Sequence, residues 1–183
     1  MTDWRATNVV VWDPFVRVYH WTQAALIAAA WITAGEWKSL HETLGYAIAA
    51  LVALRVAWGF AGPEHARFAD FVRSPRTVFR YLGDLSNGRE PRMLGHNPAG
   101  GAMIVALLGT IAATILTGWL QTSDTYWRWR TLADVHTALA TVILFLVGAH
   151  VVGVLLGCWR HRENLVKAMI TGRKRPLAAD DAE

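Results

Sequence analysis

Four long apolar stretches restrict the fold of this chain more than any other feature of its sequence. They lie at about residues 16–37, 41–60, 99–120 and 132–159, and each is long enough to cross a bilayer, which takes about 20 helical residues. None shows the alternation of apolar and polar residues that is typical of a half-buried strand. The sequence therefore predicts an all-α integral membrane protein in which four helices form a bundle.

The composition agrees with this interpretation and excludes several other classes of protein. Only 17% of the 183 residues are charged, whereas soluble domains carry about 25%, and the hydrophobic share of 54% excludes a disordered chain. The single cysteine, Cys158, excludes a disulfide scaffold, a thiolate zinc site, an iron–sulfur cluster and haem attached through a C-x-x-C-H motif. We therefore expect one membrane domain that comprises the whole chain.

The distribution of Lys and Arg predicts the orientation of the bundle. If the N-terminus, the segment between the second and third stretches and the C-terminus share one side, that side holds most of the 18 basic residues. The other side holds only Lys38, Arg128 and Arg130. The positive-inside rule then places both termini in the cytoplasm. Because topology explains the net charge of +4, we expect membrane lipid and no nucleic acid among the partners.

Two cytoplasmic segments, about 63–86 and 161–171, are predicted to hold short amphipathic helices at the membrane surface. In the first, Ser74 and Pro75 are typical of an N-cap and a first helical residue, and apolar residues then recur on one face between charged ones. The second segment has the same pattern. Asn97 and Pro98 predict the start of the third membrane helix in the same way.

Four of the seven histidines fall inside the apolar stretches, and their depths match in two pairs. His136 and His150 are 14 residues apart, which places them on nearly the same helix face and about 21 Å apart along the axis. In the predicted topology His20 lies at the cytoplasmic depth of His150, and His41 lies at the periplasmic depth of His136. An imidazole in hydrocarbon is costly unless it is paired or coordinated.

Two such pairs are what two bis-His haem groups require. We predict two non-covalent haem b groups, with one iron held by His20 and His150 on the cytoplasmic side and the other by His41 and His136 on the periplasmic side. An iron with both axial positions filled has no open site, so this arrangement suits electron transfer rather than oxygen chemistry.

Neighbouring residues allow two interpretations each. Arg55 lies 14 residues after His41, at the depth of the cytoplasmic pair, and we interpret it as the partner of a haem propionate; the alternative is that it extends to the headgroups. Small residues one or two turns from the histidines leave room for a flat ring, although close helix packing uses the same residue types. These small residues are Ala24, Gly45, Ala49 and Ala140.

The remaining histidines and the periplasmic aromatic residues are less informative. His65, His96 and His161 are expected at the surface or interface, and His96 also lies where a quinone head would need a hydrogen-bond partner or proton donor. The run YWRWR at 126–130 is typical of an aromatic belt, and it could also be a docking surface for an anionic or acidic electron donor.

Several segments resemble the bacterial cytochrome b561 family, which includes the b-type cytochrome subunits of nickel–iron hydrogenases. They are VWDPFVRVYHW, HETLGYAIAALVALRVAWGFAGPEHARF, LGHNPAGGAM, DVHTALA, GAHVVGVLL and RHRENLVKAMITGRKR. The likeness covers roughly residues 8–176. It implies a di-haem, four-helix electron carrier of the bacterial inner membrane, linked to ubiquinone or menaquinone, and it implies haem ligation by His20, His41, His136 and His150.

The partner and the reaction remain open at this point. Members of the family exchange electrons with a periplasmic dehydrogenase, hydrogenase or c-type cytochrome, or resemble superoxide oxidase. A superoxide:quinone oxidoreductase is therefore an alternative, so the sequence does not decide whether the chain is itself an enzyme. A metal-ion transporter that uses the same histidines is an alternative of another class. The sequence offers it no Met-rich or Cys-rich entry path and no ligands between the two histidine layers.

Overall fold

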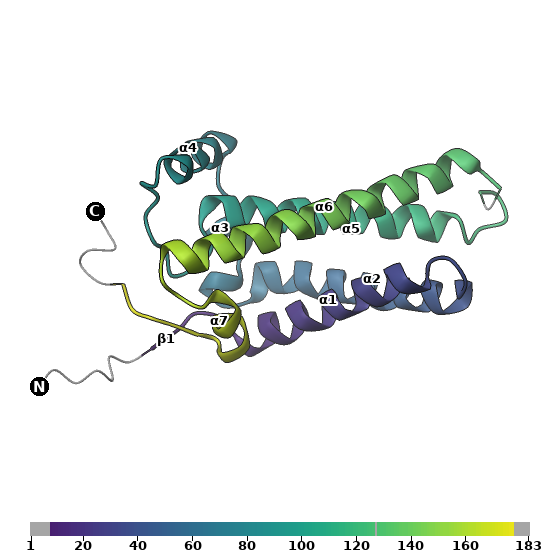
Figure 1. The fold of residues 1–183 in the computed structure, drawn as a ribbon. Helices are drawn as coiled ribbons and strands as arrows, with labels where there is room; N and C mark the ends of the chain where they lie inside the picture. The colour runs from purple at the N-terminus through teal and green to yellow at the C-terminus, as the bar shows by residue number, and fades with distance from the viewer. Residues whose placement is uncertain (1–7, 127, 178–183) are drawn as a thin grey trace, which may run out of the picture.

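The four predicted membrane helices form two antiparallel hairpins that pack into one bundle (Figure 1). In the computed structural model, which describes residues 8–126 and 128–177, these helices are α1 (Pro14–Thr33), α2 (Lys38–Ala61), α5 (Pro98–Leu120) and α6 (Arg130–Arg160). Helix α1 packs along α2, and α5 packs along α6. Contacts between α2 and α5 join the two hairpins. The predicted all-α four-helix bundle is thereby confirmed.

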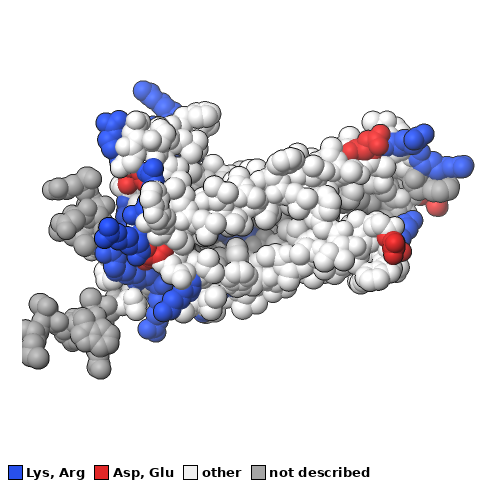
Figure 2. Space-filling view, in the orientation of Figure 1, with Lys and Arg blue, Asp and Glu red and all other residues white. Residues whose placement is uncertain are grey.

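The surface of the bundle has the character of a membrane protein. Helices α2, α5 and α6 are long and apolar enough to span a bilayer. In the 18-residue apolar stretch of each helix, only 22%, 11% and 6% of the residues, respectively, are buried inside the protein. Helix α1 is long enough to span a bilayer but less apolar than the other three, because its apolar residues are interrupted by Arg17, His20 and Gln23. Figure 2 shows an uncharged middle and charged residues at the two ends. The bundle therefore turns apolar side chains outward, as a lipid environment requires.

Three helices begin with the same N-terminal capping motif. Helices α1, α5 and α4 (Pro75–Ser86) each start with proline, and the preceding side chain accepts a hydrogen bond from the backbone N–H three residues later. The capping residues are Asp13, Asn97 and Ser74, with distances of 3.1, 2.7 and 3.3 Å. Such caps satisfy backbone donors that have no partner within the helix. The predicted starts of α4 and α5 are confirmed, and α1 starts two residues before its apolar stretch.

The first and last described segments, around Val9 and Lys174, lie at one end of the bundle, which we call the terminal end. It also carries the short helices η1 (Glu64–Ala66), α3 (Phe68–Phe71) and α7 (Leu165–Thr171), together with α4 (Figure 1). The opposite end, which we call the loop end, consists of the turn at 34–37 and the connection at 121–129. Helix α1 ends at Thr33, four residues before the predicted end of the first stretch at residue 37.

A two-stranded ladder joins the two ends of the chain, which sequence analysis did not predict. Strands β1 (Val9–Val10) and β2 (Arg173–Lys174) pair antiparallel, with Val9 opposite Lys174. Gly172 makes the turn from α7 into β2 possible, since its φ of 80° lies in the left-handed region that favours glycine. The ladder fixes the start of α1 beside the end of α7.

The apolar core lies midway along the bundle. Ile48, Val52, Ile111 and Ile143 form a buried cluster contributed by α2, α5 and α6. Ile143 is seven residues from His136 and seven from His150, so the cluster lies between the two histidine layers. At the terminal end, α3 packs so closely on α5 that a Cβ at Gly101 would collide with the carbonyl of Phe71. The core therefore separates two sites rather than filling the bundle along its whole length.

Candidate functional site

The structure brings the four membrane histidines together in two pairs. At the terminal end, the ring centres of His20 on α1 and His150 on α6 are 6.2 Å apart. At the loop end, His41 on α2 and His136 on α6 have the same separation of 6.2 Å. The helices that carry each pair belong to different hairpins and have little direct backbone contact. Each pair therefore spans the space between the hairpins.

The separation of the rings fits a metal ion between them. A ligating nitrogen lies about 2 Å from its metal and roughly 1 Å from its own ring centre, so two imidazoles on opposite sides of one ion have centres about 6 Å apart. Both histidine pairs therefore have a spacing that is compatible with two ligands of one metal ion.

The number of possible ligands beside each histidine pair favours a haem over a bare metal ion. Among the described residues, no group of three or more His, Cys, Asp or Glu side chains could hold a metal ion. A structural zinc site takes four protein ligands, whereas each pair here offers two. A macrocycle supplies the remaining in-plane ligands itself. The residues at both levels therefore fit an iron porphyrin.

Backbone carbonyls set the tautomer of the loop-end pair. His41 Nδ1 lies 2.9 Å from the carbonyl oxygen of Ala30, and His136 Nδ1 lies 3.0 Å from that of Thr114. A carbonyl only accepts hydrogen bonds, so each Nδ1 carries the proton and each Nε2 keeps its lone pair. The Thr117 hydroxyl lies 3.1 Å from the same nitrogen of His136. Both rings are thereby held in the form that binds a metal through Nε2.

Glycine shapes the space around the loop-end pair. A Cβ added at Gly118 would lie 2.9 Å from Cε1 of His136, so only glycine lets this ring approach α5 without displacement. Gly45 lies one turn from His41, and a Cβ there would meet nothing within 4 Å. The open space at Gly45 fits the predicted room for a flat ring. Gly118 was missed by sequence analysis, because no spacing rule connects it to His136.

The terminal-end pair is surrounded by buried polar groups that lack partners in the part of the chain that the structure describes. Arg55 is only 3% exposed, and its Nη1 has no hydrogen-bond partner. The same holds for His20 Nδ1, Trp58 Nε1 and both amide atoms of Gln23. Buried polar atoms without a partner are rare in folded proteins. A bound group with several acceptor oxygens, such as haem propionates, would satisfy the donors among them.

The position of Arg55 distinguishes its two interpretations. Its guanidinium lies over the rings of Phe68 and Phe71, at 5.5 and 5.7 Å from their centres. The side chain therefore lies under α3 instead of extending to the headgroups, which favours a buried anionic partner. Sequence analysis did not identify Gln23, which lies one turn from His20, because the first half of α1 contains several other polar residues.

The other three histidines lie outside the two pairs. His65 Nδ1 is 3.2 Å from Asp70, and His161 caps the end of α6. His96 differs from the expected surface residue, since its ring packs against Trp12 and Phe71 and its buried Nδ1 has no partner among the described residues. Burial, together with the positive charge of Arg55, lowers the pKa of His96 to about 3, so the imidazole is neutral at physiological pH.

The structure describes the aromatic run at 126–130 except for residue 127. Tyr126 stacks on Trp129 with ring centres 5.8 Å apart, and both side chains are exposed. Trp127 lies outside the described residues. This arrangement is compatible with an aromatic belt and with a docking surface.

Comparison with known protein families identifies a related family. The sequence profile of a family described as "Prokaryotic cytochrome b561" matches residues 11–172. No curated protein and no solved structure matches the chain. The matched range contains all four long helices and both histidine pairs, so it covers most of the chain.

Proposed function

Because the chain belongs to the prokaryotic cytochrome b561 family, a family of membrane electron carriers that contain haem b, we propose that each histidine pair holds one haem b. In this proposal His20 and His150 hold the terminal-end iron, and His41 and His136 hold the loop-end iron. When bound, each haem would supply one-electron chemistry. The observation that carries the proposal is the 6.2 Å separation at both levels.

The protein's own residues would hold, orient and shield the two groups. Carbonyls of α1 and α5 orient His41 and His136, and Arg55 would neutralise a propionate at the terminal end. The cluster around Ile143 keeps water out of the space between the two levels. A helix rise of 1.5 Å per residue separates His136 from His150 by about 21 Å along α6. These features support a relay along the bundle axis.

We further propose that electrons pass between a periplasmic redox partner at the loop end and quinone at the terminal end. The bias of Lys and Arg toward the terminal end, visible in Figure 2, supports a cytoplasmic position for both termini in a bacterial inner membrane. The neutral His96 ring, whose Nδ1 has no partner within residues 8–126 and 128–177, supports a ubiquinone or menaquinone head nearby. A c-type cytochrome, a dehydrogenase or superoxide are the candidate partners at the loop end.

The loop end does not favour superoxide over a protein partner. Lys38 pairs with Glu42 at 3.7 Å, and acidic residues lie among the cations of this end (Figure 2). A mixed surface attracts a small anion less than a uniformly positive one. The superoxide:quinone oxidoreductase therefore stays the second candidate. A metal-ion transporter has less support, because the described residues offer only the two histidines of each pair as ligands and no group of three or more.

A reduced-minus-oxidised absorption spectrum of the purified protein, with haem quantified per chain, tests the proposal. We expect two b haems per chain. His20→Ala and His150→Ala should lose the same haem, and His41→Ala and His136→Ala should lose the other. His65→Ala is the matched control and should keep both. If the wild-type protein contains no haem after expression with ample haem supply, the carrier proposal is wrong, and metal analysis would follow.

A further inference from the structure

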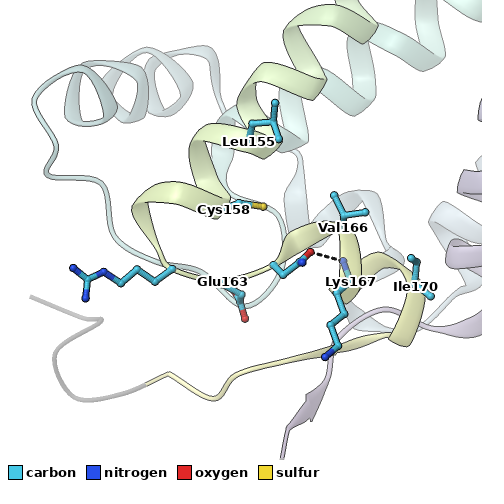
Figure 3. A pocket seen from close by; sticks show the side chains of 8 residues that line it. Leu155, Cys158, Glu163, Val166, Lys167 and Ile170 are labelled. Carbon is cyan, nitrogen blue, oxygen red and sulfur yellow. Dashed lines mark hydrogen bonds between the residues drawn. The ribbon is translucent and has the colours of Figure 1, made fainter.

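A groove at the terminal end is not used by the proposed haem sites. It has a volume of about 590 Å³ and lies between the end of α6 and helix α7 (Figure 3). Its apolar lining comes from Leu155, Val166 and Ile170, and its basic lining comes from Arg162 and Lys167. The groove continues from the membrane-spanning part of α6, so it opens where acyl chains meet headgroups.

The two kinds of lining residue are separated in space. In Figure 3 the side chains of Leu155, Val166 and Ile170 point toward one side, and Lys167 points the opposite way. Leu155 and Ile170 are 59% and 58% exposed, which is costly in water and favourable against acyl chains. A short helix with one apolar and one basic side is typical of the membrane interface.

The charge of the groove is positive because its one acidic residue is already neutralised. Glu163 binds Arg92 at 2.9 Å and Lys174 at 3.5 Å, and these contacts hold the pKa of its carboxyl below the ordinary value although burial alone would raise it. Arg162 and Lys167 are exposed, and neither forms an ion pair within the described residues. The groove therefore presents two uncompensated cations beside an apolar wall.

We propose that this groove binds one anionic phospholipid, with its phosphate near Arg162 and Lys167 and an acyl chain against Leu155, Val166 and Ile170. The cations select the headgroup by charge. The apolar wall selects a lipid over a free anion, since inorganic phosphate would leave that wall uncovered. The lining of this groove contains none of the proposed haem ligands, so the lipid proposal can be tested separately from the proposed function.

Lipid retention after reconstitution tests this proposal. The purified protein is incorporated into bilayers of equal parts phosphatidylglycerol and phosphatidylcholine, extracted in mild detergent and analysed by native mass spectrometry. Each cation near an anionic headgroup contributes roughly a fivefold preference, so two give roughly a 25-fold preference for phosphatidylglycerol. Arg162→Gln with Lys167→Gln should abolish this preference, with unchanged thermal unfolding by circular dichroism as proof of folding. Leu155→Ser with Ile170→Ser should reduce retention although both cations remain.

The control removes equal charge from the same end. Arg76→Gln with Arg80→Gln on α4 should keep the preference, because these residues lie outside the groove. An equal loss in this control would show a general surface effect and overturn the proposal. Displacement of phosphatidylglycerol by excess inorganic phosphate would also overturn it in favour of a free-anion site. Retention of neither lipid by the wild-type protein would contradict it directly.

Discussion

The two ends of the bundle hold similar histidine pairs in different surroundings. At the loop end, backbone carbonyls bind Nδ1 of both His41 and His136, and the ion pair between Lys38 and Glu42 is exposed. At the terminal end, His20 Nδ1 lacks a partner among the described residues, a buried cation lies nearby, and the ion pairs of Glu163 are buried. The protein's own backbone thus orients the loop-end pair, whereas the described residues give His20 at the terminal end no such contact.

This difference has a consequence for the proposed electron path. A carbonyl that accepts the Nδ1 proton makes the imidazole a stronger donor and stabilises ferric iron. A nearby cation such as Arg55 disfavours the extra positive charge of ferric iron. We therefore expect the loop-end haem to have the lower reduction potential. Electrons would then move favourably from the loop end toward the terminal end.

The largest expected effect comes from the buried ion pairs. Glu163→Gln leaves Arg92 and Lys174 buried without their carboxylate, and breaking a buried pair costs about 3–5 kcal/mol. The exposed pair at the loop end should matter far less, so Lys38→Gln should change stability by less than about 1 kcal/mol. Thermal unfolding in detergent, followed by circular dichroism, measures both. Equal losses in the two variants would contradict the comparison between the ends.

The second prediction concerns Arg55. Arg55→Gln should lower the potential of the terminal-end haem and leave the loop-end haem unchanged. If Arg55 stabilises the ferrous form over the ferric form by about 1.5–3 kcal/mol, its loss corresponds to roughly 60–130 mV. Spectroelectrochemical titration measures both potentials, and the haem missing from His20→Ala identifies the terminal-end one. Arg55→Lys keeps the charge and should retain most of the potential. A shift confined to the loop-end haem would refute the assignment of Arg55.

The third prediction is a pH dependence that belongs to the terminal end. The folded pKa of His96 is lowered to about 3, so below the unfolded pKa of about 6.5 the unfolded chain binds a proton that the folded chain does not. The contribution of His96 is fully present above pH 6.5 and falls by up to about 1.4 kcal/mol for each pH unit below it. Unfolding measured between pH 7 and 5 should show this loss, and His96→Phe should reduce it. An unchanged slope in that variant would exclude His96 as the cause.

The fourth prediction concerns the packing of the loop-end site. Gly118→Ala places a methyl group 2.9 Å from the His136 ring and should cost about 1–3 kcal/mol, with weaker retention of the loop-end haem. Gly109→Ala is the matched control on the same helix, because a Cβ there meets nothing within 4 Å. Haem content after mild heating distinguishes the two variants. If Gly109→Ala loses as much haem, the contact with His136 is not the reason.

Features with a local signal were predictable from the sequence. Ser74 and Asn97 identified the starts of α4 and α5, since a cap and a following proline act within one turn. The depths of the four histidines followed from helix rise and the order of the spans, and the structure brings the same two pairs together. Whether these pairs hold haem stays a prediction.

Features that depend on distant parts of the chain were not predictable. The pair of Arg92 with Glu163 joins residues 71 positions apart, and the contact of Gly118 with His136 joins two helices. No periodicity or turn motif connects such residues. The ladder between β1 and β2 was missed for a related reason, because strands of two residues are too short for any alternation to be seen.

The pairing of β1 with β2 also sets an order of assembly. A chain is synthesised from its N-terminus. The loop-end pair is complete in the nascent chain once His136 has entered the membrane, and the terminal-end pair needs His150. The start of α1, which carries His20, is fixed only after Arg173 and Lys174 leave the ribosome and pair with Val9 and Val10. We therefore expect the loop-end site to form first during synthesis, and the terminal-end site to form after β2 pairs with β1.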